Sequence, residues 1–109
     1  MINRCNGDSP LFEACESGNK ALVKYLVEKG LNISRSNMYG NTPLMRTSKN
    51  VNEAMVMYLV EKEAKINIIN KWGESPLFYA YSSGNESLVK YLIYYGKPRY
   101  LKPAEVEVK

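Results

Sequence analysis

The chain has 109 residues, a formal net charge of +4, 45% hydrophobic residues and no histidine. This composition predicts one globular domain, and the missing histidine excludes Ser-His-Asp and Cys-His catalytic groups and histidine-containing metal sites. Apart from Lys97, Arg99 and Lys102 near the C-terminus, the excess of Lys and Arg is spread thinly along the sequence, so we expect no nucleic-acid surface.

The remaining composition also favours a non-catalytic protein inside the cell. Cys5 and Cys15 are too few for a disulfide framework. No apolar run approaches the ~18 residues of a membrane span, and the sequence shows no charged-then-apolar leader. The glycines are scattered rather than gathered in a phosphate-binding loop. We therefore expect a cytoplasmic or nuclear protein with no enzyme activity, cofactor, metal or membrane contact.

A short motif occurs three times at an interval of 33 residues. Gly-Asp-Ser-Pro-Leu at 7–11 returns as Gly-Asn-Thr-Pro-Leu at 40–44 and as Gly-Glu-Ser-Pro-Leu at 73–77. A fixed period in the range of about 20–50 residues is typical of a stacked repeat array. In such arrays function belongs to the surface rather than to a buried pocket.

Within each unit, the capping residues, prolines and glycines predict two helices. A Ser or Thr that can cap the first helix precedes a proline at its first position, so we expect helices over 11 to about 16, 44 to about 49 and 77 to about 82. Gly18 and Gly84 should end this helix in units one and three, and asparagines at 19, 52 and 85 are positioned to cap a second helix.

The second helix should bury an apolar stripe. In unit one Leu22, Tyr25 and Leu26, then Val23 and Val27, recur at helical spacing, and the pattern returns in units two and three. The glycines at positions 30 and 96 should end the helix as left-handed residues just past its C-terminus. Residues 31–39 and 64–72 are then the links between units.

The middle unit lacks the two glycines that should end the helices of unit one, at positions 18 and 30. Val51 and Glu63 stand at their places, so a shared backbone would force both into positive φ, which side chains tolerate poorly. Asn50 could instead take the left-handed conformation and relieve Val51.

The unit resembles the ankyrin repeat over about residues 4–97, although Phe12, Met45 and Phe78 replace the usual histidine of its Thr-Pro-Leu-His motif. The resemblance implies an all-α, ankyrin-type α-solenoid of three helix-turn-helix repeats joined by β-hairpin-like loops. The repeats would cover about 4–36, 37–69 and 70–100, forming a single ankyrin-repeat domain over residues 1–100, with a C-terminal tail at 101–109.

The resemblance also implies a non-catalytic protein–protein interaction module that binds a protein partner through hairpin tips and the inner helix face. Carried over position by position, the expected partner-binding residues are Met38, Tyr39, Asn41, Lys49, Asn50, Lys71, Trp72, Glu74 and Ser82. The remaining positions of the same kind are Cys5, Asn6, Asp8, Glu16, Ser17 and Ser83. Tyr39 and Trp72 could be interface hot spots, or structural spacers that stack on one another.

Two other functions stay open at this point. One is small-ligand or nucleotide binding, with Trp72 or Tyr39 stacked on a base and Lys71 or Lys49 at a phosphate. The other is a purely structural piece of a longer ankyrin array.

The third unit is rich in tyrosine, and Tyr81 stands where earlier units have small residues. These tyrosines could cap the array or face a missing neighbour, so we expect either a monomer or weak end-to-end self-association.

Overall fold

The computed structural model describes residues 7–96, which contain six helices and no β-strand. The helices are α1 (Pro10–Ser17), α2 (Lys20–Glu28), α3 (Pro43–Lys49), α4 (Glu53–Glu61), α5 (Pro76–Ser83) and α6 (Glu86–Tyr95). None of these helices is long and apolar enough to cross a membrane. Cys5, Asn6, the expected end of the third repeat at residue 100 and the tail at 101–109 lie outside the described residues.

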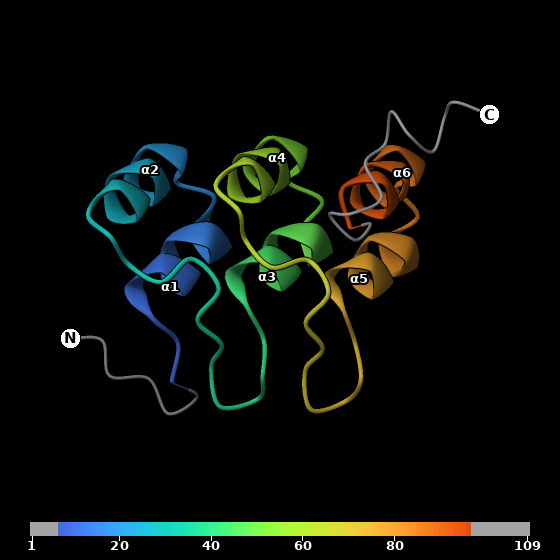
Figure 1. The fold of residues 1–109 in the computed structure, drawn as a ribbon, viewed down its shortest axis with the longest axis horizontal. Helices are drawn as coiled ribbons and strands as arrows, with labels where there is room; N and C mark the ends of the chain where they lie inside the picture. Colours follow the sequence, from blue (N-terminus) through green and yellow to red (C-terminus); the bar gives the residue numbers. More distant parts are fainter. Residues whose placement is uncertain (1–6, 97–109) are drawn as a thin grey trace.

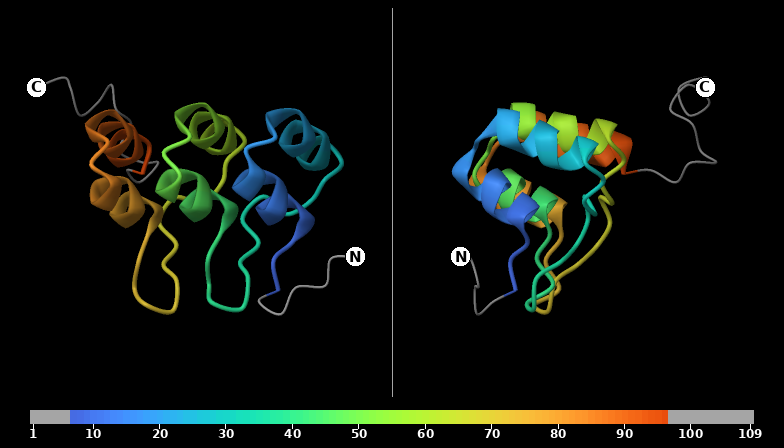
Figure 2. Two further views of the ribbon diagram at one scale, coloured as in Figure 1. Left: turned by 180° about the vertical axis from the view of Figure 1, so that it is seen from behind. Right: turned by 90° about the vertical axis from the view of Figure 1, so that its left-hand side faces the viewer.

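The helices form two layers, with α1, α3 and α5 in an inner row and α2, α4 and α6 in an outer row (Figure 1). Each inner helix packs on the outer helix that follows it, and α3 also packs on both α1 and α5. The loops before α3 and α5 project together from the inner row, as the view along the array shows (Figure 2). The predicted stack of three helix pairs is therefore present.

The predicted N-caps are confirmed at all six helices. The hydroxyl oxygen of Ser9 accepts a hydrogen bond from the Phe12 backbone N–H at 3.1 Å, and Thr42 and Ser75 do the same in their repeats. The carboxamide oxygen of Asn19 accepts from the Leu22 N–H at 3.1 Å, and Asn52 and Asn85 repeat this contact. Each cap satisfies one N–H that the first helical turn leaves without a partner.

The φ angles at the helix ends confirm the left-handed conformation predicted for Gly30, Val51 and Glu63, but not that predicted for Gly96. Val51 and Glu63 adopt φ values of 57° and 69°. Asn50 has a φ of −82°, so the alternative in which it relieves Val51 is wrong. The prediction for Gly96 is also wrong, because its φ is −87°. Helix α6 runs one residue further than α2 and α4, so Gly96 occupies the C-cap place that Lys29 occupies in α2.

The apolar stripe of the second helices is buried where a repeat precedes it. Met55 and Leu59 of α4, and Leu88 of α6, are buried in the core. The prediction is wrong for Leu22 and Tyr25 of α2, both of which are exposed. Their counterparts in α4 and α6 are covered by the repeat before them, and within residues 7–96 no repeat precedes α2.

The projecting loops are held by buried asparagines rather than by a strand ladder. The side-chain oxygen of Asn37 accepts hydrogen bonds from the Tyr39 and Asn41 N–H groups at 2.9 and 3.0 Å. Successive loops also touch, because the Lys71 N–H donates to the Tyr39 carbonyl at 2.9 Å. Gly40 allows this approach, since a Cβ there would lie 2.9 Å from the Asn70 Cα. Hydrogen bonds within each loop therefore hold its tip, and the backbone bond between the loops holds them side by side.

Candidate functional site

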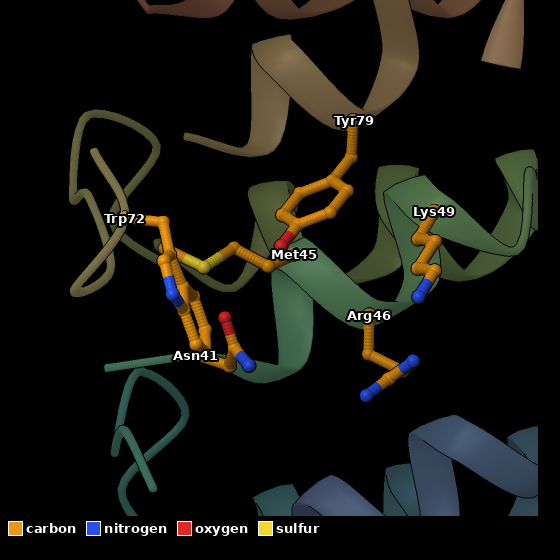
Figure 3. A pocket seen from close by; sticks show the side chains of 6 residues that line it. All are labelled: Asn41, Met45, Arg46, Lys49, Trp72 and Tyr79. Atoms are coloured by element: carbon orange, nitrogen blue, oxygen red, sulfur yellow. The ribbon is translucent and has the colours of Figure 1, made fainter. Parts of the chain in front are cut away.

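A hollow of about 230 Å³ opens between the second projecting loop and the inner helices. Its lining comes from two neighbouring repeats: Asn41, Met45, Arg46 and Lys49 from the second, and Trp72 and Tyr79 from the third (Figure 3). Trp72 and Asn41 lie at one end of the hollow, and Arg46 and Lys49 lie at the other. The site therefore joins an aromatic end to a cationic end.

Trp72 forms the aromatic wall and is held in place from two sides. Its indole ring stacks on the Tyr39 ring with centroids 5.6 Å apart and an interplanar angle of 24°. Its backbone N–H donates to the side-chain oxygen of Asn70 at 2.9 Å. The side chain is nevertheless 62% exposed. A large aromatic that is both fixed and exposed can bury area against a partner at a low cost in side-chain entropy.

Asn70 organises the floor beside Trp72. Its side-chain nitrogen lies within hydrogen-bond distance of the Asn41 side-chain oxygen at 2.8 Å, the Glu74 carboxylate at 3.0 Å and the Tyr79 hydroxyl at 3.1 Å. The Tyr79 hydroxyl donates to the same Glu74 carboxylate. This network links the projecting loop to α5, which fixes the position of the Tyr79 ring in the hollow.

The same network shifts the titration of two side chains. Hydrogen bonds from Asn70, and then from Tyr79, lower the pKa of the Glu74 carboxyl, and the positive charge of Lys49 adds to this effect. Burial raises the pKa of Tyr79, as does its bond to the Glu74 carboxylate. At neutral pH, Glu74 is therefore a carboxylate and Tyr79 a neutral hydroxyl donor.

The two cationic side chains at the other end differ in their pairing. The Arg46 Nε lies 2.8 Å from the Glu16 carboxylate, and its guanidinium lies over the Phe12 ring at 5.5 Å. These contacts tie the second repeat to the first and neutralise the Arg46 charge. Lys49 has no ion pair within the part of the chain that the structure describes. Lys49 is thus the cation of this site that a partner can pair with.

The nine predicted site residues divide into two groups. Asn41, Lys49 and Trp72 line the hollow, Tyr39 supports Trp72, and Glu74 lies in the adjoining network. The other four are exposed but do not line the hollow. They are Met38 and Lys71 on the projecting loops, Asn50 at the end of α3, and Ser82 on α5.

The sequence prediction missed Met45, Arg46 and Tyr79. A signal for two of them was present. Arg46 lies three residues before Lys49 and therefore shares its helix face. Tyr79 is the counterpart of Arg46 one repeat later, so the same reasoning reaches it. Met45 is buried and carried no surface signal.

Two observations concern metal binding and thiol chemistry in the described residues. No group of three His, Cys, Asp or Glu side chains that could hold a metal occurs within residues 7–96. Cys15 is free and buried, and burial raises the pKa of its thiol to about 12. Such a thiol stays protonated and is a poor nucleophile.

The comparison with protein families identifies the repeat. A family model described as "Ankyrin repeats (3 copies)" matches residues 1–70 and residues 32–102. The chain therefore belongs to the ankyrin repeat family. Ankyrin repeats are generally protein–protein interaction modules and are typically non-catalytic. No curated protein matches the chain.

Proposed function

Since the chain is an ankyrin repeat protein, we propose that it binds a protein partner inside the cell on the face formed by the projecting loops and the inner helices. The hollow between the second and third repeats carries this proposal, because it combines an exposed, immobilised tryptophan with a cation that has no ion pair among the described residues. Aromatic anchors in preformed hollows dominate binding energy at protein interfaces.

The chemistry of the hollow defines what the partner presents. An apolar side chain of the partner would lie against the exposed ring of Trp72, and a neighbouring carboxylate would reach the Lys49 ammonium group. Tyr39, Met38 and Lys71 would extend the contact along the loop tips. The charge pair would mainly set association rate and register, and the aromatic contact would supply most of the affinity.

Nucleotide binding is a weaker candidate for the same residues. The hollow, at about 230 Å³, lies below the roughly 300–1,000 Å³ of typical small-molecule sites. Tyr39 and Trp72 also use one ring face each on one another, which reduces the surface left for stacking on a base.

Affinity capture from lysate of the source cells, followed by titration of the purified partner, tests the proposal. Trp72→Ala should weaken binding about 30-fold, the equivalent of ~2 kcal/mol for a hot-spot aromatic. Lys49→Glu should weaken it further by introducing repulsion against the partner carboxylate. The matched controls are Tyr94→Ala and Lys24→Ala, an exposed aromatic and an exposed lysine on the outer row of helices.

Unchanged affinity in a folded Trp72→Ala variant would remove the hollow from the proposed interface. A thermal shift with a nucleotide panel, lost in Lys49→Glu, would instead favour the ligand-binding function.

A further inference from the structure

The N-terminal end of the array exposes apolar side chains at positions that the rest of the array buries. Leu22 is 41% exposed, whereas its counterparts Met55 and Leu88 are buried in the later repeats. Tyr25 is also exposed, while the tyrosines that follow it at the repeat interval are half-buried. Pro10 is exposed and its counterparts are buried. These three residues are called the N-terminal end face.

The C-terminal end shows the reverse arrangement. Phe78 is 43% exposed, whereas its counterparts Phe12 and Met45 are buried by the repeat that follows each of them. Leu77 is only half-buried and Ile93 is exposed, although the equivalent side chains of the earlier repeats are better covered. Together with Tyr81, these residues are called the C-terminal end face.

The two end faces are the two halves of an interface that the chain already forms twice. Between repeats one and two, and again between two and three, α3 packs on α1 and on α5. The counterparts of the exposed end-face residues are buried there, Phe12 and Met45 for one face and Met55 and Leu88 for the other. The residue types are preserved: proline, an aliphatic side chain and tyrosine on one side, leucine and an aromatic or methionine on the other.

The projecting loops show the same open end. A Cβ on Gly40 would collide with the backbone of the next loop, whereas a Cβ on Gly73 would meet nothing within 4 Å. The last loop thus has the space into which a following loop fits.

We propose that a second copy of this chain docks head to tail, with its N-terminal end face on the C-terminal end face of the first. The occupant follows from the continuity with the internal interface, because this chain carries both of the surfaces that pack on one another inside it. Such a contact is heterologous, so it leaves one free face of each kind and can be extended by further copies. The two end faces share no residue with the hollow proposed above as the partner surface.

Tyr81 sets how tight this contact is. It is 74% exposed, and its counterparts Cys15 and Ser48 are small and fully buried against the next repeat. A tyrosine at a place that fits a serine overpacks the contact, which typically costs ~1–3 kcal/mol, or about 5- to 150-fold in affinity. Tyr81 would have to turn outward for a second copy to dock. The wild-type contact is therefore weak, and Tyr81 is the residue that limits it.

Sedimentation velocity of the full chain, from micromolar to millimolar concentration, tests the proposal. The wild type should show a sedimentation coefficient that rises with concentration. Tyr81→Ser should shift this rise to a concentration about 5- to 150-fold lower. Leu22→Glu and Phe78→Glu should each abolish it. Both side chains are exposed in the single chain, so circular dichroism and thermal unfolding should show these two variants folded.

Mixing the two disrupted variants separates head-to-tail docking from any other mode. Leu22→Glu keeps an intact C-terminal end face and Phe78→Glu keeps an intact N-terminal one. In a background that also carries Tyr81→Ser, the equimolar mixture should therefore form a 1:1 dimer that does not grow further. A Tyr81→Ser chain that stays monomeric at millimolar concentration would overturn the proposal, and so would a mixture that does not associate. Either result would leave the end faces to another chain segment or to water.

Discussion

Replacing Glu63 by glycine should stabilise the protein, because this residue holds a glycine conformation at the end of α4. Its φ is 69°, and the N–H groups of Glu63 and Ala64 donate to the carbonyls of Val60 and Leu59 at 2.9 Å each. Gly30 ends α2 in the same way, with φ of 92° and equivalent bonds at 3.0 and 3.3 Å. The two helix endings are therefore alike, and Glu63 differs in carrying a Cβ in the left-handed region.

The expected gain follows from two opposing terms. A side chain in the left-handed region costs roughly 1–2 kcal/mol relative to glycine. Glycine raises the entropy of the unfolded chain, which takes back about 0.4–1 kcal/mol. The net expectation for Glu63→Gly is a rise of about 0.5–1 kcal/mol in the free energy of unfolding, or roughly 2–6 °C in Tm for a domain of this size.

Equilibrium urea unfolding followed by circular dichroism measures this gain. Glu63→Ala is the matched control, since it removes the charge and keeps the Cβ, and it should recover little of the effect. Gly30→Ala is the reciprocal change. A Cβ there meets nothing within 4 Å, so its expected loss of about 0.5–1 kcal/mol would contain backbone strain, less the unfolded-state entropy, and no steric clash. A midpoint for Glu63→Gly equal to or below that of wild type would show that the left-handed helix end carries no strain, and the reasoning would fail.

Three further predictions concern single residues. Val51→Gly should raise the free energy of unfolding by about 1 kcal/mol or more, because a β-branched residue with a φ of 57° is strained more than Glu63; an unchanged urea midpoint would contradict this. Asn70→Ala should lower stability by ~2 kcal/mol, since the N–H groups of Trp72 and Glu74 lose their acceptor; a loss under about 0.5 kcal/mol in the same assay would show that water replaces it. In a Cys5→Ser background, Cys15 should resist a thiol reagent at pH 8, because its pKa of about 12 leaves almost no thiolate below that pH; fast labelling of the folded protein would refute its burial.

The parts of the fold that the sequence predicts well are the local ones. A hydroxyl followed by proline, or an asparagine before an apolar run, satisfies helix-end N–H groups within a few residues, so all six N-caps could be placed from sequence. Positive φ at Val51 and Glu63 followed from their register with glycines in the other repeats. The prediction for Gly96 was wrong because α6 is one residue longer than α2 and α4. Gly96 is therefore the C-cap residue rather than the left-handed residue that follows it.

The parts that could not be predicted depend on neighbours that the repeat pattern hides. A periodic sequence predicts the same burial at equivalent positions of each repeat. Leu22 is nevertheless exposed and Leu88 is buried, because within residues 7–96 only Leu88 has a repeat before it. The lining of the hollow also depends on contacts between repeats. Trp72 and Met45 are 27 positions apart in the sequence and meet only because the third repeat stacks on the second. The sequence analysis predicted Asn41, Lys49 and Trp72 of this site. It missed Met45, Arg46 and Tyr79.

Because the hollow lies between two repeats, partner binding there depends on the packing of the third repeat on the second. Asn70 both holds the N–H of Trp72 and contacts Asn41 of the preceding repeat, so the same side chain shapes the aromatic wall and joins the two loops. In a repeat array each unit is stabilised mainly by its immediate neighbours, and within residues 7–96 the third unit has only one. Detachment of the third repeat would therefore remove Trp72 and Tyr79 from the hollow before the first two repeats unfold. A second copy docked on the C-terminal end face would give the third repeat its missing neighbour. Head-to-tail assembly would then favour the binding-competent hollow without touching it.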